Sequence, residues 1–262
     1  MIRNKNIDEG NRFDFGRTSE NYAKFRDIYP REFYEKIVDK GLCVSGQNVL
    51  DIGTGTGVLP RNMYQYGSTW TGIDISENQI MQAKKLAAAE NMNIEFSVCG
   101  AEELNFPSQI FDVVTACQCF MYFDYERMTP LLKTILKPEG KLVILYMAWL
   151  PNEDEIAGAS EKLALTYNPT WTGAGETRKP IYIPDRVRDD FEVITQEVYD
   201  IEVPFTRESW HGRMKTCRGI GASLAEKDIA KWEIEHHDLL NKIAPESFNV
   251  LHYVAMTVLK VK

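Results

Sequence analysis

Three glycines in alternate positions carry the strongest chemical signal in this chain. Gly53, Gly55 and Gly57 directly follow the apolar run of residues 49–52, and a helical pattern begins at Val58. Because glycine has no Cβ, a ligand can approach bare backbone amides at such a strand-to-helix turn. The segment therefore predicts a binding loop for a nucleotide-like ligand, although a tight connection without a ligand fits the same residues.

Two carboxylates near this loop restrict what it binds. Asp74 ends a second strand-like run, 21 residues after Gly53, which is the distance at which an acidic side chain meets ribose hydroxyls. Asp51 lies two residues before Gly53, where its charge would repel a pyrophosphate and attract an ammonium or sulfonium group. Val58 also stands where the dinucleotide pattern Gly-x-Gly-x-x-Gly needs its third glycine. These residues favour S-adenosylmethionine over NAD.

The elements that position these residues alternate between strand and helix. Apolar runs without polar alternation are expected as strands buried on both faces, and amphipathic runs between them as helices. The expected strands are residues 48–52, 69–75, 94–99, 112–117 and 141–146, the helices are residues 31–40, 58–66, 76–88 and 125–136, and residues 137–140 form a turn. This order predicts an α/β fold with a doubly wound, mostly parallel sheet.

The pattern changes after residue 150. Helices are expected over residues 152–167, 206–217 and 225–243, an irregular segment over residues 168–185, and strands over residues 191–205 and 248–261. The two late strands could pair antiparallel at one edge and complete a seven-stranded sheet. We therefore expect an amino-terminal helical lid (1–46), a cofactor-binding core (47–150), and a cap with the last strands (151–262), all within one domain.

Five motifs together resemble class I S-adenosylmethionine-dependent methyltransferases. They occupy residues 51–57 (Asp-Ile-Gly-Thr-Gly-Thr-Gly), 72–76, 100–106, 111–114 and 136–140, in the order of that family. Within the class, the chain most resembles the small-molecule group that includes the ubiquinone/menaquinone and trans-aconitate enzymes. The resemblance covers roughly residues 20–150 and implies a Rossmann-like fold, S-adenosylmethionine as cofactor, S-adenosylhomocysteine as product and a small organic acceptor.

The resemblance also implies roles for the matched positions. The methionine part of the cofactor would be lined by Gly53, Thr54 and Gly55, and its amino group would be oriented by Asp51. Asp74 would hold the ribose, and Ile75 would pack on the adenine.

The adenine edge would be met by the turn Gly100, Ala101 and Glu102. Many relatives carry Asp where this chain has Gly100, so adenine recognition falls to Glu102 or Glu103, and the sequence does not decide between them. Cys117 and Gln118 end the fourth expected strand, where the resemblance places the methionine part beside the substrate.

Residues 22–30 resemble the Tyr-x-x-x-Arg-x-x-Tyr-Pro segment that folds over the cofactor in the same enzymes. This resemblance implies that Tyr22 covers the cofactor and that Arg26 meets its carboxylate through two hydrogen bonds. An aromatic side chain packed on the sheet, with an exposed arginine, fits these residues equally well.

Methyl transfer from a sulfonium is an in-line displacement that depends mainly on orientation and desolvation, so no catalytic side chain is assigned. Candidate substrate residues lie at the end of the fifth strand and in the cap, and they are Tyr146, Trp149, Trp171, Tyr182, Trp210, His211 and Arg213. For each aromatic residue, core packing is the better interpretation. His236 and His237 lie in a charged helical run and are predicted to form a solvated face.

Composition excludes several classes of function. With 30 Lys and Arg against 38 Asp and Glu, the net charge of −8 disfavours RNA, DNA and membrane surfaces as partners. The longest apolar run has nine residues, 142–150, against the roughly 20 that a membrane-spanning helix needs. The polar first residues lack a secretory signal, so a cytoplasmic location is expected.

Cysteine usage predicts reduced thiols and no metal. The chain has five cysteines, an odd number without the spacing of a disulfide framework. Cys117 and Cys119 have no second cysteine pair to complete a metal site. Two alternatives to a methyltransferase remain open at this point, a non-catalytic S-adenosylmethionine-binding protein and an NAD-dependent oxidoreductase. A protein substrate is not excluded, and the oligomeric state is not predicted.

Overall fold

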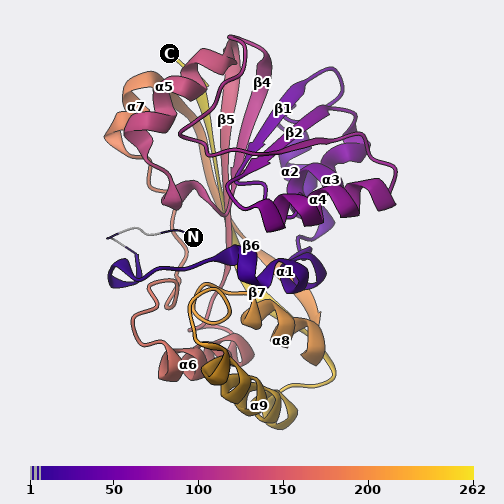
Figure 1. Cartoon of the computed structure of the whole chain (residues 1–262), viewed down its shortest axis with the longest axis vertical. Helices are drawn as coiled ribbons and strands as arrows, with labels where there is room; N and C mark the ends of the chain where they lie inside the picture. The colour runs from indigo at the N-terminus through magenta and orange to yellow at the C-terminus, as the bar shows by residue number, and fades with distance from the viewer. Residues whose placement is uncertain (1, 3–4, 6) are drawn as a thin grey trace. The chain divides into compact units, whose positions relative to one another are not determined.

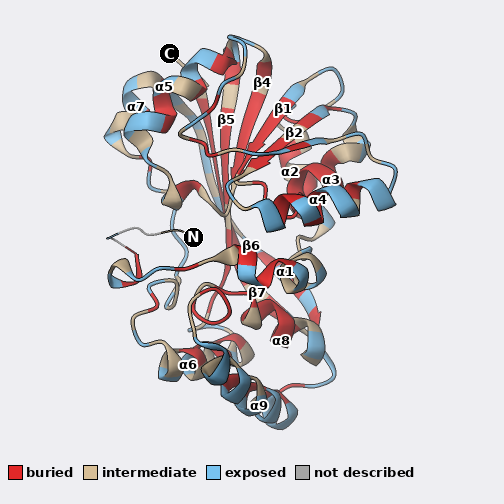
Figure 2. Cartoon of the chain, viewed as in Figure 1, coloured by how far each residue is buried: buried red, intermediate tan, exposed pale blue. Residues whose placement is uncertain are grey.

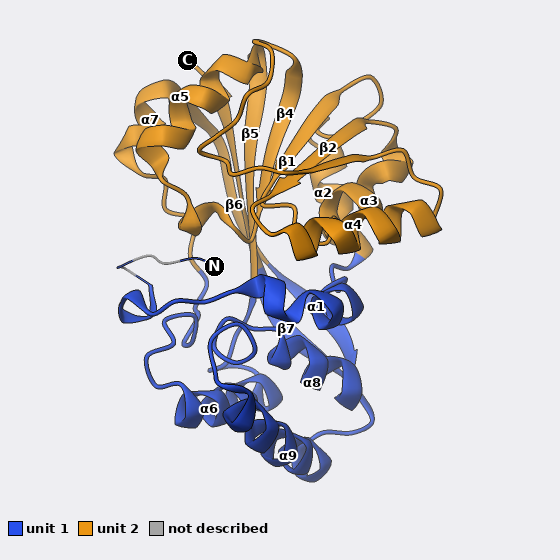
Figure 3. Cartoon of the chain, in the orientation of Figure 1, with its two compact units in different colours: residues 1–30, 148–178, 200–253 blue, residues 31–147, 179–199, 254–262 orange. Residues whose placement is uncertain are grey.

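The computed structural model describes residues 2, 5 and 7–262. Residues 1, 3, 4 and 6, which belong to the expected lid, lie outside the described residues. The chain divides into two compact units (Figure 3). Unit 1 holds residues 1–30, 148–178 and 200–253, and unit 2 holds residues 31–147, 179–199 and 254–262. Residues 31–46, expected in the lid, thus lie in unit 2.

A seven-stranded sheet has the order β3-β2-β1-β4-β5-β7-β6 (Figure 1). Its strands are β1 (Asn48–Ile52), β2 (Thr69–Asp74), β3 (Glu95–Val98), β4 (Phe111–Cys117), β5 (Leu136–Trp149), β6 (Phe191–Thr206) and β7 (Ser247–Val261). The pairs β1·β2, β1·β4, β2·β3 and β4·β5 are all parallel. The strand order reverses at β1, because the chain builds outward first on one side of this strand and then on the other. The prediction of a doubly wound sheet is confirmed.

Helices flank the parallel strands of unit 2. They are α2 (Arg31–Val38), α3 (Val58–Met63), α4 (Glu77–Ala89), α5 (Tyr125–Ile135) and α7 (Asp185–Asp190). Figure 1 shows α2, α3 and α4 together on one side, and α5 with α7 on the other. The α4 helix begins where the capping pattern predicts, because the Ser76 side chain accepts a hydrogen bond from the backbone N–H of Gln79.

Burial follows from the residue types of these elements. The central strands are apolar on both faces, and β1 and β4 are buried along most of their length (Figure 2). Their core includes Leu50, Val114 and Ile144 with Met128 and Leu132 of α5. In contrast, β6 alternates between inward and exposed residues, the pattern of a strand with one solvated face, and it lies last in the strand order.

Two local features of unit 2 differ from the sequence prediction. Residues 137–140 were expected as a separate turn, yet they lie within β5, whose pairing with β4 shifts register there: Phe111 pairs with Leu136, and Val113 pairs with Lys141. The extra residues form an irregularity that accommodates Pro138, which has no N–H to donate. The short helix α7 was not predicted, because Val187 is its one buried residue and leaves no periodic signal.

Unit 1 contains the remaining helices, α1 (Ser19–Phe25), α6 (Glu155–Tyr167), α8 (Arg207–Lys215) and α9 (Glu226–Ile243), with single 3-10 turns at Asp8–Gly10 and Phe15–Thr18. The α6 helix packs on α9, and α8 packs on both α9 and α1. Side-chain caps fix two helix starts: Asp154 accepts from the N–H of Ala157, and Thr206 and Ser209 form a capping box. The helical cap predicted after residue 150 is thus present.

All five cysteines are free thiols. Within the described part of the chain, no helix is both long enough and apolar enough to cross a membrane.

Candidate functional site

Asp51 is a buried carboxylate at the penultimate position of β1, the strand between β2 and β4. Its residue is 2% exposed, and its Oδ1 accepts a hydrogen bond of 2.6 Å from the hydroxyl of Thr115 on β4. Burial raises the pKa of Asp51 to about 6, and the hydrogen bond from Thr115 partly opposes this rise. The carboxylate is therefore ionised at pH 7 but poorly compensated, which favours a cationic ligand group beside it.

The glycine loop follows directly and needs glycine at each alternate position. Gly53, Gly55 and Gly57 have φ values of +65°, +56° and +73°, in the left-handed region that side chains with a Cβ rarely adopt. At Gly53 there is also no room, because a Cβ would lie 2.8 Å from the Sγ of Cys119. The loop therefore presents backbone rather than side chains.

Asp74, the last residue of β2, ties this loop to the second strand. Its Oδ2 accepts from the N–H of Gly55 at 3.0 Å, and its Oδ1 accepts from the N–H of Ser76 at 2.8 Å. Burial raises its pKa despite both hydrogen bonds. Each carboxylate oxygen retains a further lone pair, so Asp74 can accept additional hydrogen bonds from two ligand hydroxyls. The bond to Gly55 was not anticipated from the sequence.

The predicted adenine residues gather beyond Asp74. Ile75 is 53% exposed, an unusual state for a large apolar side chain. A Cβ on Gly100 would lie 3.5 Å from Ile75 Cγ2, 3.5 Å from Glu102 Oε2 and 3.8 Å from Glu103 Oε2. Glu102 Oε1 accepts from the N–H of Asp124 at 2.9 Å. Both acids therefore lie near Gly100, whereas Ala101 is buried in the core.

The chain after β4 lies against the glycine loop. Cys117 ends the strand, and Gln118 adopts a left-handed φ of +66°, a strained conformation of the kind that clusters at functional sites. Its backbone N–H donates to Leu145 O at 2.9 Å, and its Nε2 donates to Met147 O at 2.5 Å.

Cys119, which sequence reasoning considered only as a metal ligand, donates from Sγ to Ile52 O at 3.1 Å. Together with Thr115 it was missed as part of this site. The sequence signal that could have placed Cys119 in this site is its position two residues beyond Cys117, at the same edge of the sheet. No group of three or more metal-ligating side chains stands together among the residues that the structure describes.

Tyr22 and Arg26 lie in unit 1, where Arg26 is already bound to the protein. Its Nε donates to Thr216 Oγ1 at 2.9 Å, its Nη2 donates to Thr216 O at 3.0 Å, and its guanidinium lies 4.8 Å from the Tyr22 ring centre. The role of both residues toward the cofactor stays a prediction.

The candidate substrate residues separate into two groups. Tyr146 lies near the end of β5 in unit 2, and Tyr182, also in unit 2, is 77% exposed. The other five, Trp149, Trp171, Trp210, His211 and Arg213, lie in unit 1 and are at most 6% exposed. Trp149 contacts Trp210 edge-on at 5.6 Å and Trp171 at 6.3 Å between ring centres. All five side chains are buried in unit 1, and a role for them toward a substrate stays a prediction.

His236 corrects a prediction. It was expected on a solvated face with His237, yet it is fully buried, and only His237 is exposed. Its Nε2 lies 2.9 Å from Ser160 Oγ, and its Nδ1 lies 2.9 Å from His211 Nδ1. The charged residues of α9 gave no sign that His236 is buried. Its burial results from tertiary packing, because one face of α9 packs on α6 and α8.

Burial decides the protonation of these two histidines. It lowers the pKa of His236 to about 3 and that of His211 to about 4, and repulsion among the neighbouring histidines adds to the effect. Trp210 Nε1 donates to Ser160 Oγ at 2.9 Å, and His211 Nε2 lies 3.7 Å from Glu233. Two neutral rings fit this chain of donors and acceptors, so the network is interior polar packing rather than a surface charge cluster.

Comparisons with known proteins find similarity over the part of unit 2 that contains these residues. A family model described as a methyltransferase domain matches residues 49–140. The ubiquinone biosynthesis O-methyltransferase of Coxiella burnetii is 32% identical over 108 residues, 41% of this chain and 46% of that protein. The protein of the same name from Bradyrhizobium diazoefficiens is 29% identical over 191 residues, 71% of this chain and 73% of that protein.

The solved structure of the YcgJ protein of Bacillus subtilis matches with a TM-score of 0.51 at 18% identity, over 87% of this chain and 98% of that chain. This likeness shows the fold. The chain spans about half the length of the Coxiella relative. Residues 49–140 are thus similar to methyltransferase domains, in agreement with the motif order and with the fold of the solved relative.

Substitution of Gly53 by alanine is expected to cost more stability than the same change at Gly46. Both residues have positive φ, so both lose about 1–2 kcal/mol to left-handed strain. A Cβ at Gly46 meets nothing within 4 Å, whereas one at Gly53 meets Cys119, and overpacking adds about 1–3 kcal/mol. Denaturant unfolding of both variants measures the difference, and equal losses would contradict the crowding at Gly53.

The buried histidines are expected to make the folded state sensitive to acid. Because the pKa of His236 is lower in the folded state, the unfolded chain binds more protons below pH 6.5, and stability falls as the pH decreases. Between pH 7 and pH 5, the free energy of unfolding of wild type should fall by about 2 kcal/mol more than that of His236→Asn. Leu240→Ala, buried on the same helix but without a titratable group, is the control.

The comparison with the variant is needed because Asp51 acts in the opposite direction: its raised pKa favours the folded state on acidification. Unfolding curves at the two pH values give the result. The difference in free energy of unfolding between wild type and Leu240→Ala should be the same at both pH values. If the difference between wild type and His236→Asn is also the same at both, His236 is not buried as a neutral ring.

Proposed function

We propose that this chain is a methyltransferase that transfers a methyl group from S-adenosylmethionine to a small organic acceptor by in-line displacement. The observation that carries the proposal is the pair of carboxylates around the glycine loop, in a domain of methyltransferase type. Asp51 is buried at the end of the central strand, and Asp74 accepts from the loop amide of Gly55.

The charge of Asp51 fits the cofactor. S-adenosylmethionine carries an ammonium group and a sulfonium centre. Either would compensate the carboxylate of Asp51, whose pKa burial raises despite the hydrogen bond from Thr115. A pyrophosphate would instead add negative charge beside Asp51. This physical difference, together with Val58 in place of a third glycine, argues against an NAD-dependent oxidoreductase.

The remaining cofactor contacts follow from the same edge of the sheet. We assign Asp74 to the two ribose hydroxyls, because it has two oxygens with unused lone pairs. The exposed side chain of Ile75 provides an apolar surface for the adenine, with the Gly100 turn and its acids beside it. Gly53, Thr54, Cys117 and Gln118 would line the methionine part.

The sulfonium, when bound, supplies an electrophilic methyl group and a neutral thioether leaving group. This chain's residues then have to hold the donor in one orientation and exclude water, which the rigid loop and the buried Asp51 are suited to do. No side chain is assigned as a general base. The excess of acidic residues supports a small molecule rather than a nucleic acid as acceptor.

Replacement of Asp74 by alanine is expected to weaken binding of S-adenosylhomocysteine by about 1.5–3 kcal/mol, the loss typical of hydrogen bonds to a charged group. Calorimetric titration with S-adenosylhomocysteine and, separately, with NAD measures this, and Glu95→Ala, an exposed acid at the start of β3, is the control. Unchanged affinity in Asp74→Ala would remove the ribose assignment. Binding of NAD instead would overturn the proposed function.

Cofactor affinity is expected to fall as the pH decreases through 6. The pKa of Asp51 is about 6 in the ligand-free site, so below this pH the carboxyl is protonated and no longer attracts an ammonium group. Titrations with S-adenosylhomocysteine at pH 5.5, 6.5 and 7.5 should show this loss in wild type and a weak, nearly flat profile in Asp51→Asn. The same slope in both proteins would assign the pH dependence to another group.

A further inference from the structure

One arginine in unit 1 is buried without a compensating anion. Arg213, on α8, is 4% exposed, and its Nε is closed off from solvent without a hydrogen-bond partner. Its contacts are a hydrogen bond of 3.1 Å from Nη1 to the Cys217 thiol and a stack at 5.0 Å on the Trp149 ring. Across residues 2, 5 and 7–262, no carboxylate forms an ion pair with it.

The groups that face Arg213 leave its charge uncompensated. They are the guanidinium of Arg26, the Cys217 thiol and the phenols of Tyr22 and Tyr29. A thiol is a weak acceptor, a phenol is neutral near pH 7, and Arg26 adds a second positive charge. His252 also faces it, with a pKa that burial lowers to about 3, so this ring is neutral and offers no negative charge.

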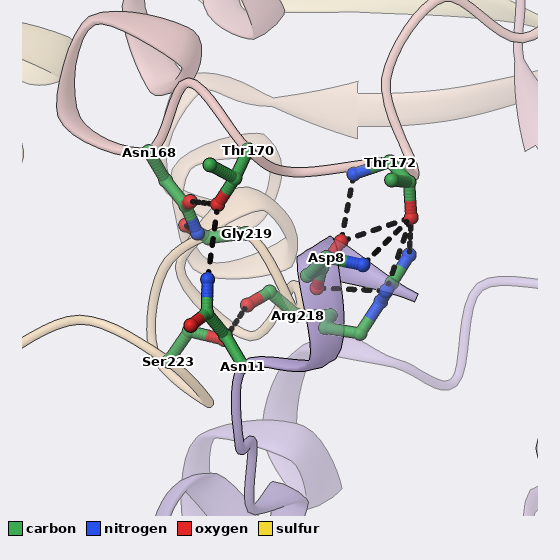
Figure 4. A network of polar contacts seen from close by, with 8 residues as sticks. All are labelled: Asp8, Asn11, Asn168, Thr170, Thr172, Arg218, Gly219 and Ser223. Carbon is green, nitrogen blue, oxygen red and sulfur yellow. Dashed lines mark hydrogen bonds and ion pairs between the residues drawn. The ribbon is translucent and has the colours of Figure 1, made fainter. Parts of the chain in front are cut away.

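A second arginine of unit 1 shows how this fold ordinarily treats such a side chain. The side chain of Arg218 is 11% exposed, and its Nη1 forms an ion pair of 2.7 Å with the buried Asp8. Thr172 binds both residues, and its backbone N–H donates to Asp8 Oδ1 at 2.7 Å (Figure 4). Pairing of this kind offsets the desolvation of both charges, and Arg213 lacks it.

A buried guanidinium without an anion loses its hydration and gains little in return. Arg213 keeps a planar set of N–H donors that matches a carboxylate, and its aromatic neighbour Trp149 offers an apolar wall. We propose that Arg213 is the anchor of a binding site in unit 1 for the carboxylate of a small organic ligand. The proposal goes beyond the proposed function, because it concerns a ligand site of unit 1 alone.

The first test measures the thermal midpoint of the full chain in acetate, benzoate and succinate, each against chloride of equal ionic strength. At least one carboxylate should raise the midpoint of wild type, as a ligand that binds only the folded state does. The response should be lost in Arg213→Met and weakened in Arg213→Lys, which keeps the charge without the planar fork. No response in wild type, or an unchanged response in Arg213→Met, overturns the proposal.

The matched control is Arg218→Met. This change leaves Asp8 buried without its partner and should lower the midpoint clearly. Arg213→Met removes an uncompensated charge and keeps an apolar stem, so its midpoint without ligand should equal or exceed that of wild type. A loss as large as that of Arg218→Met would make Arg213 a structural residue and contradict the assignment.

Failure of this proposal is distinguishable from failure of the proposed function. Asp74→Ala tests the cofactor site of unit 2, and a protein that binds no S-adenosylhomocysteine can still show an Arg213-dependent response to carboxylates. Conversely, a protein that binds S-adenosylhomocysteine normally and shows no Arg213-dependent response retains the proposed function and loses the carboxylate anchor.

Discussion

The buried negative charge of Asp51 is the constraint around which unit 2 is arranged. The carboxylate stands at the end of the central strand, and burial raises its pKa to about 6. A charge in this position is tolerated only with hydrogen-bond donors or cations close by. Thr115 on the neighbouring strand supplies one donor, and the glycine loop leaves backbone rather than bulky side chains beside it.

The parallel sheet explains why these groups meet. The carboxyl ends of β1, β2 and β4 open at one edge, at the point where the strand order reverses, and this is where doubly wound sheets bind ligands. Asp74 fastens the glycine loop to β2, and Cys119 closes on Gly53 from the β4 side. The loop is thus held from two neighbouring strands, which gives a ligand a preformed surface.

Unit 1 shows three ways in which a protein interior accommodates polar groups. Arg218 and Asp8 neutralise each other, and His211 and His236 avoid charge by a lowered pKa. Arg213 does neither, and an arginine cannot lose its proton at ordinary pH. An unpaired arginine among aromatic rings is consistent with an interior whose polar balance is completed by a ligand.

The sequence by itself determined most of the fold and the central residues of the candidate site. Strand and helix periodicity, the glycine spacing and the two aspartates are local signals, so the doubly wound sheet and the edge with Asp51 and Asp74 could be predicted. Tertiary structure alone decided which side chains complete these groups. The bond from Gly55 to Asp74, the approach of Cys119 to Gly53, the burial of His236 and the unpaired charge of Arg213 all depend on residues distant in sequence. Periodicity reports which face of an element is apolar, but it carries no information about the partner that this face will meet.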